Sequence, residues 1–308
     1  MLQDISSDNK RIAKNAFLLY CRMLILLVLG LFTSRVILQA LGVENYGIQS
    51  VVVGFLGIFS FITSSMTTAI GRFITVEIGK NNLFRLKQVF SASVTVQFLM
   101  GILILFLVET FGYWFLQTKM NIPEGRETAA LCCLHCAAIS STLSLFTIPF
   151  QSCIIAHEKM GAFAYLSLFE AFMKLLICYL VFVSPGDKLI TYAILLVITN
   201  FLNISFYVIY SLRKFEECTF VFTFDKRLFK EMWNFAGWNM FGNGAWILNT
   251  QGVNMLLNIY FGVIVNAARG VADQVNNIIL MFVNNFMMAL NPQITKSYAA
   301  GNKEYAFS

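Results

Sequence analysis

Runs of about 20 predominantly apolar residues recur along almost the whole 308-residue chain, and they restrict its fold more than any other feature. A helix of that length crosses a hydrocarbon core of roughly 30 Å, in which the backbone must satisfy its own hydrogen bonds. Hydrophobic residues make up 58% of the chain and charged residues only 12%. The sequence therefore predicts an all-α integral membrane protein, a polytopic helical bundle. The expected spans are residues 16–39, 46–70, 88–112, 128–154, 161–183, 188–211, 232–258 and 264–290.

The basic residues are distributed unevenly over the segments between these runs. Fifteen of the 22 Lys and Arg residues fall in segments expected on the side of the N-terminus, and three fall in segments expected on the other side. Cytoplasmic loops carry such an excess, which predicts a multi-pass protein with a cytoplasmic N-terminus. The net charge of +6 follows this topology and does not indicate nucleic-acid binding. The first apolar run has full spanning length, so no cleaved signal peptide is expected.

The sequence also carries a weak internal repeat with an offset of about 220 residues. Asn-Ala-Phe at 15–17 corresponds to Asn-Phe-Ala at 234–236, and Leu-Gly-Val at 41–43 corresponds to Phe-Gly-Val at 261–263. An offset that spans six helices returns the chain to the same side of the membrane. The pattern therefore predicts two parallel repeats about an axis along the membrane normal.

This repeat divides the chain into three parts. We expect a six-helix lobe at 1–211, a cytoplasmic linker at 212–231, and the first two helices of an incomplete second lobe at 232–308. Doubling the repeat gives a protein of about 440 residues. The sequence is therefore interpreted as a truncated piece of a longer protein, and we expect it to lack transport activity on its own.

Polar residues interrupt the last apolar run in a helical pattern. Arg269, Asp273, Asn276 and Asn277 lie within about 100° of one another around a helix axis, and apolar residues occupy the opposite side. Arg and Asp near mid-span oppose insertion into lipid, and Asp273 is too short to reach the membrane surface. The stripe is therefore predicted to face protein or a water-filled cavity.

A second polar stripe follows the run at 232–258 and includes Asn239, Asn243 and Asn254. One interpretation is that these amides hold the last two helices together through interhelical hydrogen bonds. The other is that both stripes line a hydrated path or binding cavity. Two full-length stripes exceed what helix association requires, which favours the cavity.

Isolated ionisable residues lie inside the expected spans of the first lobe. Arg22 and Arg35 either reach to opposite membrane surfaces or bind an anion in a central cavity. Glu170 and Lys174 are spaced i, i+4, which favours a neutralised pair within one helix, with a proton or ion relay as the alternative. Asp273 is a further candidate for ion or proton coupling.

The run Cys-Cys-Leu-His-Cys at 132–136 places several metal-ligand residue types on one helix. No second Cys/His cluster exists in the sequence to complete four ligands, so apolar packing is the favoured interpretation and no metal site is expected. The sequence contains no phosphate-binding loop and no nucleophile motif. We therefore expect neither a cofactor nor an enzymatic activity.

Two segments carry a resemblance to a known family. They are QALGVENYGIQSVVVGFLGIFSF at 39–61 and TTAIGRF at 67–73. With a Leu-Gly pair ending the first helix, a Tyr-Gly pair opening the second and Arg72 closing it, they resemble polysaccharide flippases of the Wzx type. These flippases belong to the multidrug/oligosaccharidyl-lipid/polysaccharide exporter superfamily. The resemblance implies a fold like that of the multidrug and toxic compound extrusion (MATE) transporters, of which this chain covers about two thirds if the doubled repeat is the full length.

What the resemblance implies is translocation of undecaprenyl-diphosphate-linked oligosaccharide from the inner to the outer leaflet by alternating access, for O-antigen or capsular polysaccharide synthesis. Arg22, Arg35 and Arg269 match positions that face the central cavity in this fold and would meet the diphosphate. Asp273 departs from a purely cationic lining. The implied location is the inner (cytoplasmic) membrane, and the implied partners are membrane lipids together with a polysaccharide polymerase and glycosyltransferases of the same pathway.

Two alternatives remain at the level of sequence. A multidrug exporter driven by sodium or protons is expected to use an acidic residue deep in a helix, for which Glu170 or Asp273 would serve. A polytopic enzyme of glycan assembly needs clustered acids or histidines at a loop, and the sequence offers only scattered residues such as Glu109, Glu124 and the neighbours His157 and Glu158.

Overall fold

The computed structural model describes the backbone of the chain except at residues 1, 58, 119–121, 123–124, 220–225 and 301–308. Side chains are described for the same residues except 2–12, 61, 247–248, 250–252, 254–275 and 277–278. All regular structure in the described part is helical. The elements are α1 (Leu2–Gly57), α2 (Ser60–Gly79), α3 (Leu83–Leu107), the π-helix η1 (Val108–Gly112), α4 (Tyr113–Thr118), α5 (Glu127–Ala156), α6 (Met160–Val183), α7 (Lys188–Lys214) and α8 (Lys226–Ala299).

The first long helix contains a break at Gly42. Gly42 has φ 78° and ψ 168° inside α1, a conformation that glycine adopts readily and other residues rarely do. The break falls between the first two expected spans, and the second of these continues from α1 into α2. The expected end of this span at residue 70 is wrong, because α2 runs to Gly79. Arg72, which lies just beyond the expected end of this span, is therefore within the helix.

The helices of the lobe begin and end at local signals. The side chain of Asn82 accepts a hydrogen bond from the Arg85 amide at 3.0 Å and starts α3. The side chain of Asp187 accepts from the amides of Leu189 and Ile190 and starts α7. Each interaction satisfies amides that have no partner within their own helix. Short connections between long apolar helices then force sequence neighbours to pack side by side.

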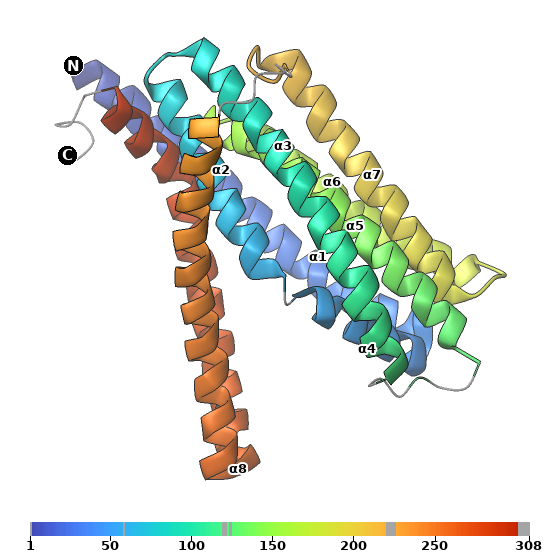
Figure 1. Ribbon diagram of the computed structural model, residues 1–308. Coiled ribbons are helices and arrows are strands. Elements are labelled where there is room, and N and C mark those ends of the chain that lie inside the picture. The colour runs from blue at the N-terminus through green and yellow to red at the C-terminus, as the bar shows by residue number, and fades with distance from the viewer. Residues whose placement is uncertain (1, 58, 119–121, 123–124, 220–225, 301–308) are drawn as a thin grey trace.

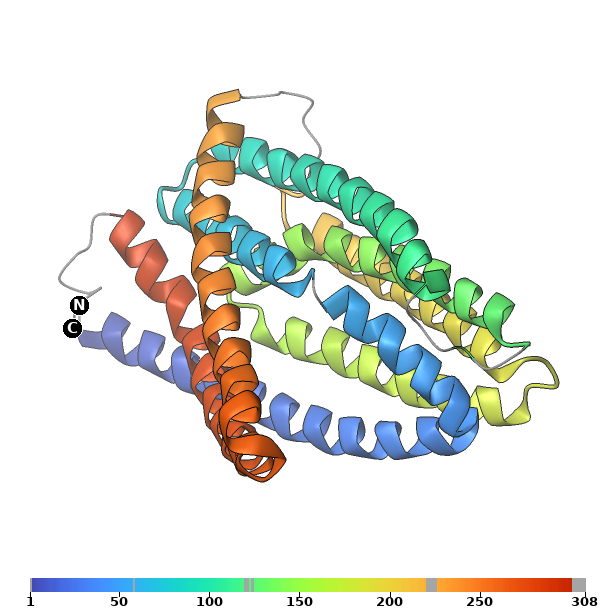
Figure 2. The ribbon, with the colours of Figure 1, turned by 60° about the horizontal axis from the view of Figure 1, so that its bottom comes forward.

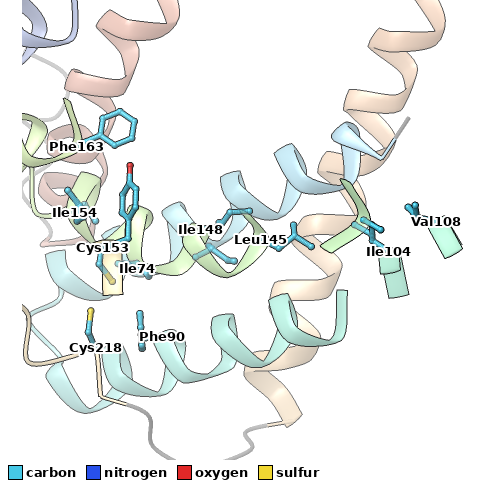
Figure 3. Packing of buried hydrophobic residues seen from close by; sticks show 14 of the residues in the cluster. Ile74, Phe90, Ile104, Val108, Leu145, Ile148, Cys153, Ile154, Phe163 and Cys218 are labelled. Carbon is cyan, nitrogen blue, oxygen red and sulfur yellow. The ribbon is translucent and has the colours of Figure 1, made fainter. Parts of the chain in front are cut away.

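Helix α5 lies at the centre of the lobe formed by α1–α7 and packs against α1, α2, α3 and α7. Its buried residues meet those of α2, α3 and α6, as Figure 3 shows for Ile74, Phe90, Ile148 and Phe163. The rings of Phe90 and Phe150 pack edge to face with centroids 5.3 Å apart. This core fixes the positions of the helices that carry the site.

Helix α8 is folded back on itself. A straight helix of 74 residues would extend about 110 Å, whereas α2 with 20 residues extends about 30 Å. Both parts of α8 nevertheless contact α2, through Asn243 near its beginning and Lys296 near its end. We name residues 226–246 the first arm and residues 279–299 the second arm. The arms contain the beginning of the seventh expected span and the end of the eighth, and Figures 1 and 2 show them running in opposite directions.

The arms are close to the lobe at one end of the molecule and separate from it at the other. We name the first of these the basic end, because Lys80, Arg85, Lys159, Arg213 and Lys214 lie near the connections there. Figure 1 shows the part of α8 farthest from this end projecting away from α3–α7. The lobe and α8 therefore diverge with distance from the basic end, and we name the region between them the wedge.

Five helical stretches of the described residues are long and apolar enough to cross a membrane. One of them, Ala13–Gly57, is 45 residues long and contains the first expected span and the beginning of the second. The other four are Leu83–Thr118, Glu127–Ala156, Met160–Val183 and Lys188–Lys214. These four coincide with the third to sixth expected spans and establish a multi-pass helical membrane protein.

Candidate functional site: a polar pocket between the lobe and α8

A pocket of about 480 Å³ lies where the lobe meets the second arm of α8. We name it the interlobe pocket. Residues with hydroxyl or amide side chains are frequent in its wall, together with Arg72, two methionines and three other residues. Its lining residues are Thr67, Thr68, Gly71, Arg72 and Thr75 of α2, Ser152 and Ile155 of α5, and Asn284, Met287, Met288, Asn291, Pro292 and Thr295 of α8.

Arg72 is the only charged side chain among the described lining residues of this pocket. It is exposed, and its guanidinium carbon lies 4.4 Å from the centre of the Phe235 ring on the first arm. Such a cation–π contact orients the guanidinium without neutralising its charge. The pocket therefore has a positive charge and no described acidic side chain in its wall to balance it.

The pocket threonines that belong to α2 are engaged with their own helix. The hydroxyl of Thr75 donates to the Gly71 carbonyl at 2.7 Å, and that of Thr68 donates to the Ser64 carbonyl at 3.0 Å. A hydroxyl has a single hydrogen to donate, so these groups offer only lone pairs to the pocket. Side chains in the wall that can donate to an anion include Arg72 and the amides of Asn284 and Asn291.

Two of the asparagines predicted to line a cavity make contacts near this pocket. Asn243 Nδ2 donates to Ser65 Oγ at 2.8 Å and approaches Ser64 Oγ at 3.4 Å, so it joins the first arm to α2. Asn239 Nδ2 donates to the Phe235 carbonyl of its own helix at 2.8 Å. The Asn243 bond is interhelical, but it joins the first arm to α2, whereas the interpretation from the sequence placed such bonds between the last two helices.

The remaining residues of the predicted polar stripes are not among the described residues that line the interlobe pocket. Asn276 is exposed. Arg269, Asp273, Asn254 and Asn277 lie in the part of α8 whose side chains fall outside the described residues. The predicted roles of Arg269 in diphosphate binding and of Asp273 in ion coupling therefore stay predictions.

A second, smaller pocket of about 290 Å³ lies inside the lobe. We name it the lobe pocket. Glu170 and Lys174 are the charged residues in its described wall, which also includes Gln49, Ser140 and Asn200. Lys174 Nζ lies 2.6 Å from one carboxylate oxygen of Glu170. Asn203 Nδ2 donates to the other oxygen at 3.0 Å. Both oxygens of the carboxylate are therefore engaged by side chains of the chain itself.

Arg22 points toward the interior of the lobe. Its Nε donates to Ser167 Oγ on α6, and its guanidinium carbon lies 4.4 Å from the centre of the Phe163 ring. It is also close enough to Glu170 and Tyr207 to interact with them electrostatically. Arg35, in contrast, is exposed on α1. The structure thus brings Arg22 and Glu170 into one neighbourhood and keeps Arg35 apart from them.

The histidines pair with carboxylates at opposite ends of the lobe. His135 Nδ1 lies 2.7 Å from Glu109 Oε2, beside the π-helix. At the basic end, His157 contacts the carboxylate of Glu217 and stacks on Phe215 with centroids 4.4 Å apart. Burial favours the protonated form of Glu217, but its hydrogen bonds and the charge of His157 outweigh burial and lower its pKa. Among the described residues, no group of three or more His, Cys, Asp or Glu side chains forms a metal site.

The sequence reasoning missed Arg72 as a site residue because it ended the second span too early. A usable signal was present in the spacing of Thr68, Gly71, Arg72 and Thr75, which lie on one helix face at intervals of three and four. Extending the helix beyond residue 70 would have placed Arg72 on that face.

Comparison with known proteins establishes the fold. No family model and no curated protein matches the sequence. A solved outward-facing structure of a multidrug resistance MATE family transporter of the MOP superfamily matches with a TM-score of 0.80 at 10% identity, covering 96% of this chain and 66% of that one. The bent form of the Vibrio cholerae MATE transporter VcmN matches with a TM-score of 0.78 at 18% identity, covering 96% and 67%.

A third similar structure comes from Pyrococcus furiosus. It is a MOP superfamily transporter described as having a binding pocket of reverse polarity that suggests a different function, and it matches with a TM-score of 0.73 at 14% identity, covering 96% and 66%. The chain therefore has the MATE-like fold, and it spans about two thirds of the length of these structures.

Proposed function

We propose that this chain forms part of a membrane flippase that moves an anionic, lipid-diphosphate-linked oligosaccharide between leaflets. The interlobe pocket carries this proposal, because Arg72 is the only charged group in its described wall. A guanidinium presents five donors in a planar fork that suits the oxygens of a diphosphate. The apolar lipid tail would lie in the membrane beside the wedge between the lobe and α8.

The charges inside the lobe support the same proposal. Arg22 and Lys174 supply two positive charges near the single carboxylate of Glu170. Such an interior attracts an anion more readily than a cation. The partners proposed on this basis are lipid-linked oligosaccharides in the inner membrane and the polymerase and glycosyltransferases that make and use them.

A cation-coupled multidrug exporter is the second candidate. It is favoured by the likeness to a multidrug resistance MATE transporter and by a buried oxygen next to Glu170, outside the lining of the lobe pocket. The Oδ1 atom of Asn203 is buried beside Glu170 and accepts no hydrogen bond from any described group. That oxygen and the carboxylate are ligands that a small cation prefers, although Lys174 already provides a positive charge there.

Equilibrium binding separates the two candidates without requiring transport. The purified chain in detergent is titrated with a prenyl diphosphate, with the matching prenyl alcohol and with a lipophilic cationic dye. The flippase proposal expects the diphosphate to bind at least tenfold more tightly than the alcohol, since each charge-assisted hydrogen bond contributes about 1.5 to 3 kcal/mol. Tighter binding of the dye than of the diphosphate would instead support the exporter.

A further inference from the structure

The three elements that line the interlobe pocket meet again one helical turn closer to the basic end. The lining residues Thr75, Ile155 and Pro292 belong to α2, α5 and α8. Gly79, Glu158 and Lys296 follow them by three or four residues, which is about one turn of helix. Contacts among these later residues therefore close the pocket at the basic end.

Glu158 binds two side chains of the second arm. Its Oε1 lies 2.8 Å from Lys296 Nζ, and its Oε2 accepts a hydrogen bond from Gln293 Nε2 at 2.9 Å. The side chain of Glu158 is 6% exposed and that of Lys296 is 22% exposed. Charge-assisted hydrogen bonds of this kind are stronger than neutral ones, so they fasten α8 to the turn between α5 and α6.

The lobe holds Glu158 in a defined position for this contact. Its φ of 57° is unusual for a residue other than glycine, and a residue keeps such a conformation only where its surroundings impose it. The preceding His157 is fixed by stacking on Phe215 and by its contact with Glu217. The carboxylate is thus presented to α8 from a constrained turn.

The backbones also approach closely at this end. A Cβ atom added at Gly79 would lie 2.6 Å from the carbonyl oxygen of Lys296 and 2.9 Å from the Cβ of Ala299. A glycine is therefore required for α2 and the second arm to meet as they do. Toward the opposite end of the molecule, α8 diverges from α3–α7 (Figure 1).

From this asymmetry we infer that Glu158, Gln293 and Lys296 form a gate that shuts the interlobe pocket at the basic end. Opening the pocket toward that side requires Glu158 to release Lys296 and Gln293, so that the second arm moves away from Gly79. This inference goes beyond the proposed function, since such a gate would act on any substrate that enters the pocket.

Cysteine labelling tests the gate. Thr68→Cys places a thiol in the pocket, and sealed vesicles are treated with a membrane-impermeant maleimide. The experiment uses a vesicle preparation in which Lys214→Cys reacts with the maleimide, because the basic end of the molecule then faces the medium. The chain without an added cysteine gives the background from its seven native cysteines.

We expect Glu158→Gln and Lys296→Gln each to speed labelling of Thr68→Cys about tenfold, the effect of losing one charge-assisted hydrogen bond. The exchange Glu158→Lys with Lys296→Glu should return the rate toward that of the parent. Lys159→Gln, next to Glu158 but exposed, is the matched control and should leave the rate unchanged.

Unchanged labelling in Lys296→Gln, or an exchange variant as fast as the single variants, would overturn the gate. If Glu158→Gln fails to accumulate, Lys296→Gln and the exchange variant still test the gate, because both keep a carboxylate among the three gate residues. The labelling rate is measured without substrate. Failure of prenyl diphosphate to bind would therefore contradict the proposed function and leave the gate intact.

Discussion

The lobe pocket and the interlobe pocket treat charge in opposite ways. In the lobe pocket, the carboxylate of Glu170 is bound by Lys174 and Asn203, so a negative group is matched inside the protein. In the interlobe pocket, Arg72 faces hydroxyl, amide and thioether side chains and the ring of Phe235, with no acidic residue in the described wall. Of these two pockets, the interlobe pocket is therefore the one with an unmatched charge in its described wall.

The cost of an unmatched charge in a membrane protein makes this difference informative. Ionisable groups within spanning segments oppose insertion by about 2.5 to 3.5 kcal/mol each, and they are commonly paired or directed into a hydrated cavity. Lys174 lies in the apolar helix Met160–Val183 and is paired with Glu170. Arg72 lies in α2 and lines the interlobe pocket. The pair of Glu170 and Lys174 can be explained by its contribution to stability. The guanidinium of Arg72 has no such partner in the described wall of its pocket and is available to bind an external anion.

The largest expected effect follows from removing the unmatched charge. Arg72→Gln should weaken binding of a prenyl diphosphate about 10- to 100-fold, because the guanidinium supplies charge-assisted hydrogen bonds of about 1.5 to 3 kcal/mol each. Arg72→Lys should weaken it less, since it keeps the charge and loses the planar fork. Titration of purified variants in detergent measures both.

Arg213→Gln is the matched control, because Arg213 is an exposed arginine at the basic end of α7 and does not line the pocket. It should leave the affinity unchanged. Equal affinities for the parent and Arg72→Gln would show that the unmatched charge has no part in ligand binding. The contrast between the two pockets would then have no functional meaning.

The next effect concerns the matched pocket and should appear in stability. Glu170→Gln leaves Lys174 without its carboxylate and should lower the free energy of unfolding by about 1 kcal/mol, because the side chain of Lys174 is 46% exposed and an exposed ion pair contributes little. Affinity for the diphosphate should change little. Thermal unfolding in detergent and the binding titration report the two quantities separately.

The double variant Glu170→Gln with Lys174→Met is the control for this prediction. Removing both charges should recover part of the lost stability, because no unpaired ammonium remains. A loss of diphosphate binding in Glu170→Gln at normal stability would contradict a purely structural pair. It would assign the lobe pocket a direct part in ligand binding or coupling.

Adding a carboxylate to the interlobe pocket, so that its charge is matched as in the lobe pocket, should change diphosphate affinity by a smaller amount. Asn291→Asp adds a carboxylate to the wall that Arg72 shares and should weaken diphosphate binding about three- to tenfold, since like charges then face each other across the pocket. Asn291→Ala removes the amide without adding charge and should weaken binding less. The same titrations measure both variants, and stronger diphosphate binding in Asn291→Asp would show that the diphosphate does not bind in the interlobe pocket.

Much of this architecture was predictable because hydrophobic length is a strong signal. The expected runs at 128–154, 161–183 and 188–211 correspond to α5, α6 and α7 with shifts of only a few residues. A spanning helix must hide its backbone and face lipid along much of its length. Composition alone therefore reveals where such a helix lies.

The ends of helices and the contacts between them were less predictable. A polar face directed into a protein pocket lowers local hydropathy, and for this reason the second span was ended before Arg72. The approach of Gly79 to Lys296 and the binding of Glu158 by Gln293 join residues more than 130 positions apart. No local pattern in the sequence encodes such pairs.

The smallest expected effect separates helix association from cavity lining at Asn243. Asn243→Ala removes the hydrogen bond to Ser65 and should lower the free energy of unfolding by about 0.6 kcal/mol, the average for such bonds between membrane helices. Diphosphate affinity should stay unchanged, because Asn243 does not line the interlobe pocket. Asn239→Ala is the matched control. The Asn239 amide bonds only its own helix among the described contacts, and alanine favours helix, so stability should not fall. If Asn243→Ala instead lowers affinity at unchanged stability, the asparagines of the first arm belong to the binding surface, and the site extends beyond the wall that holds Arg72.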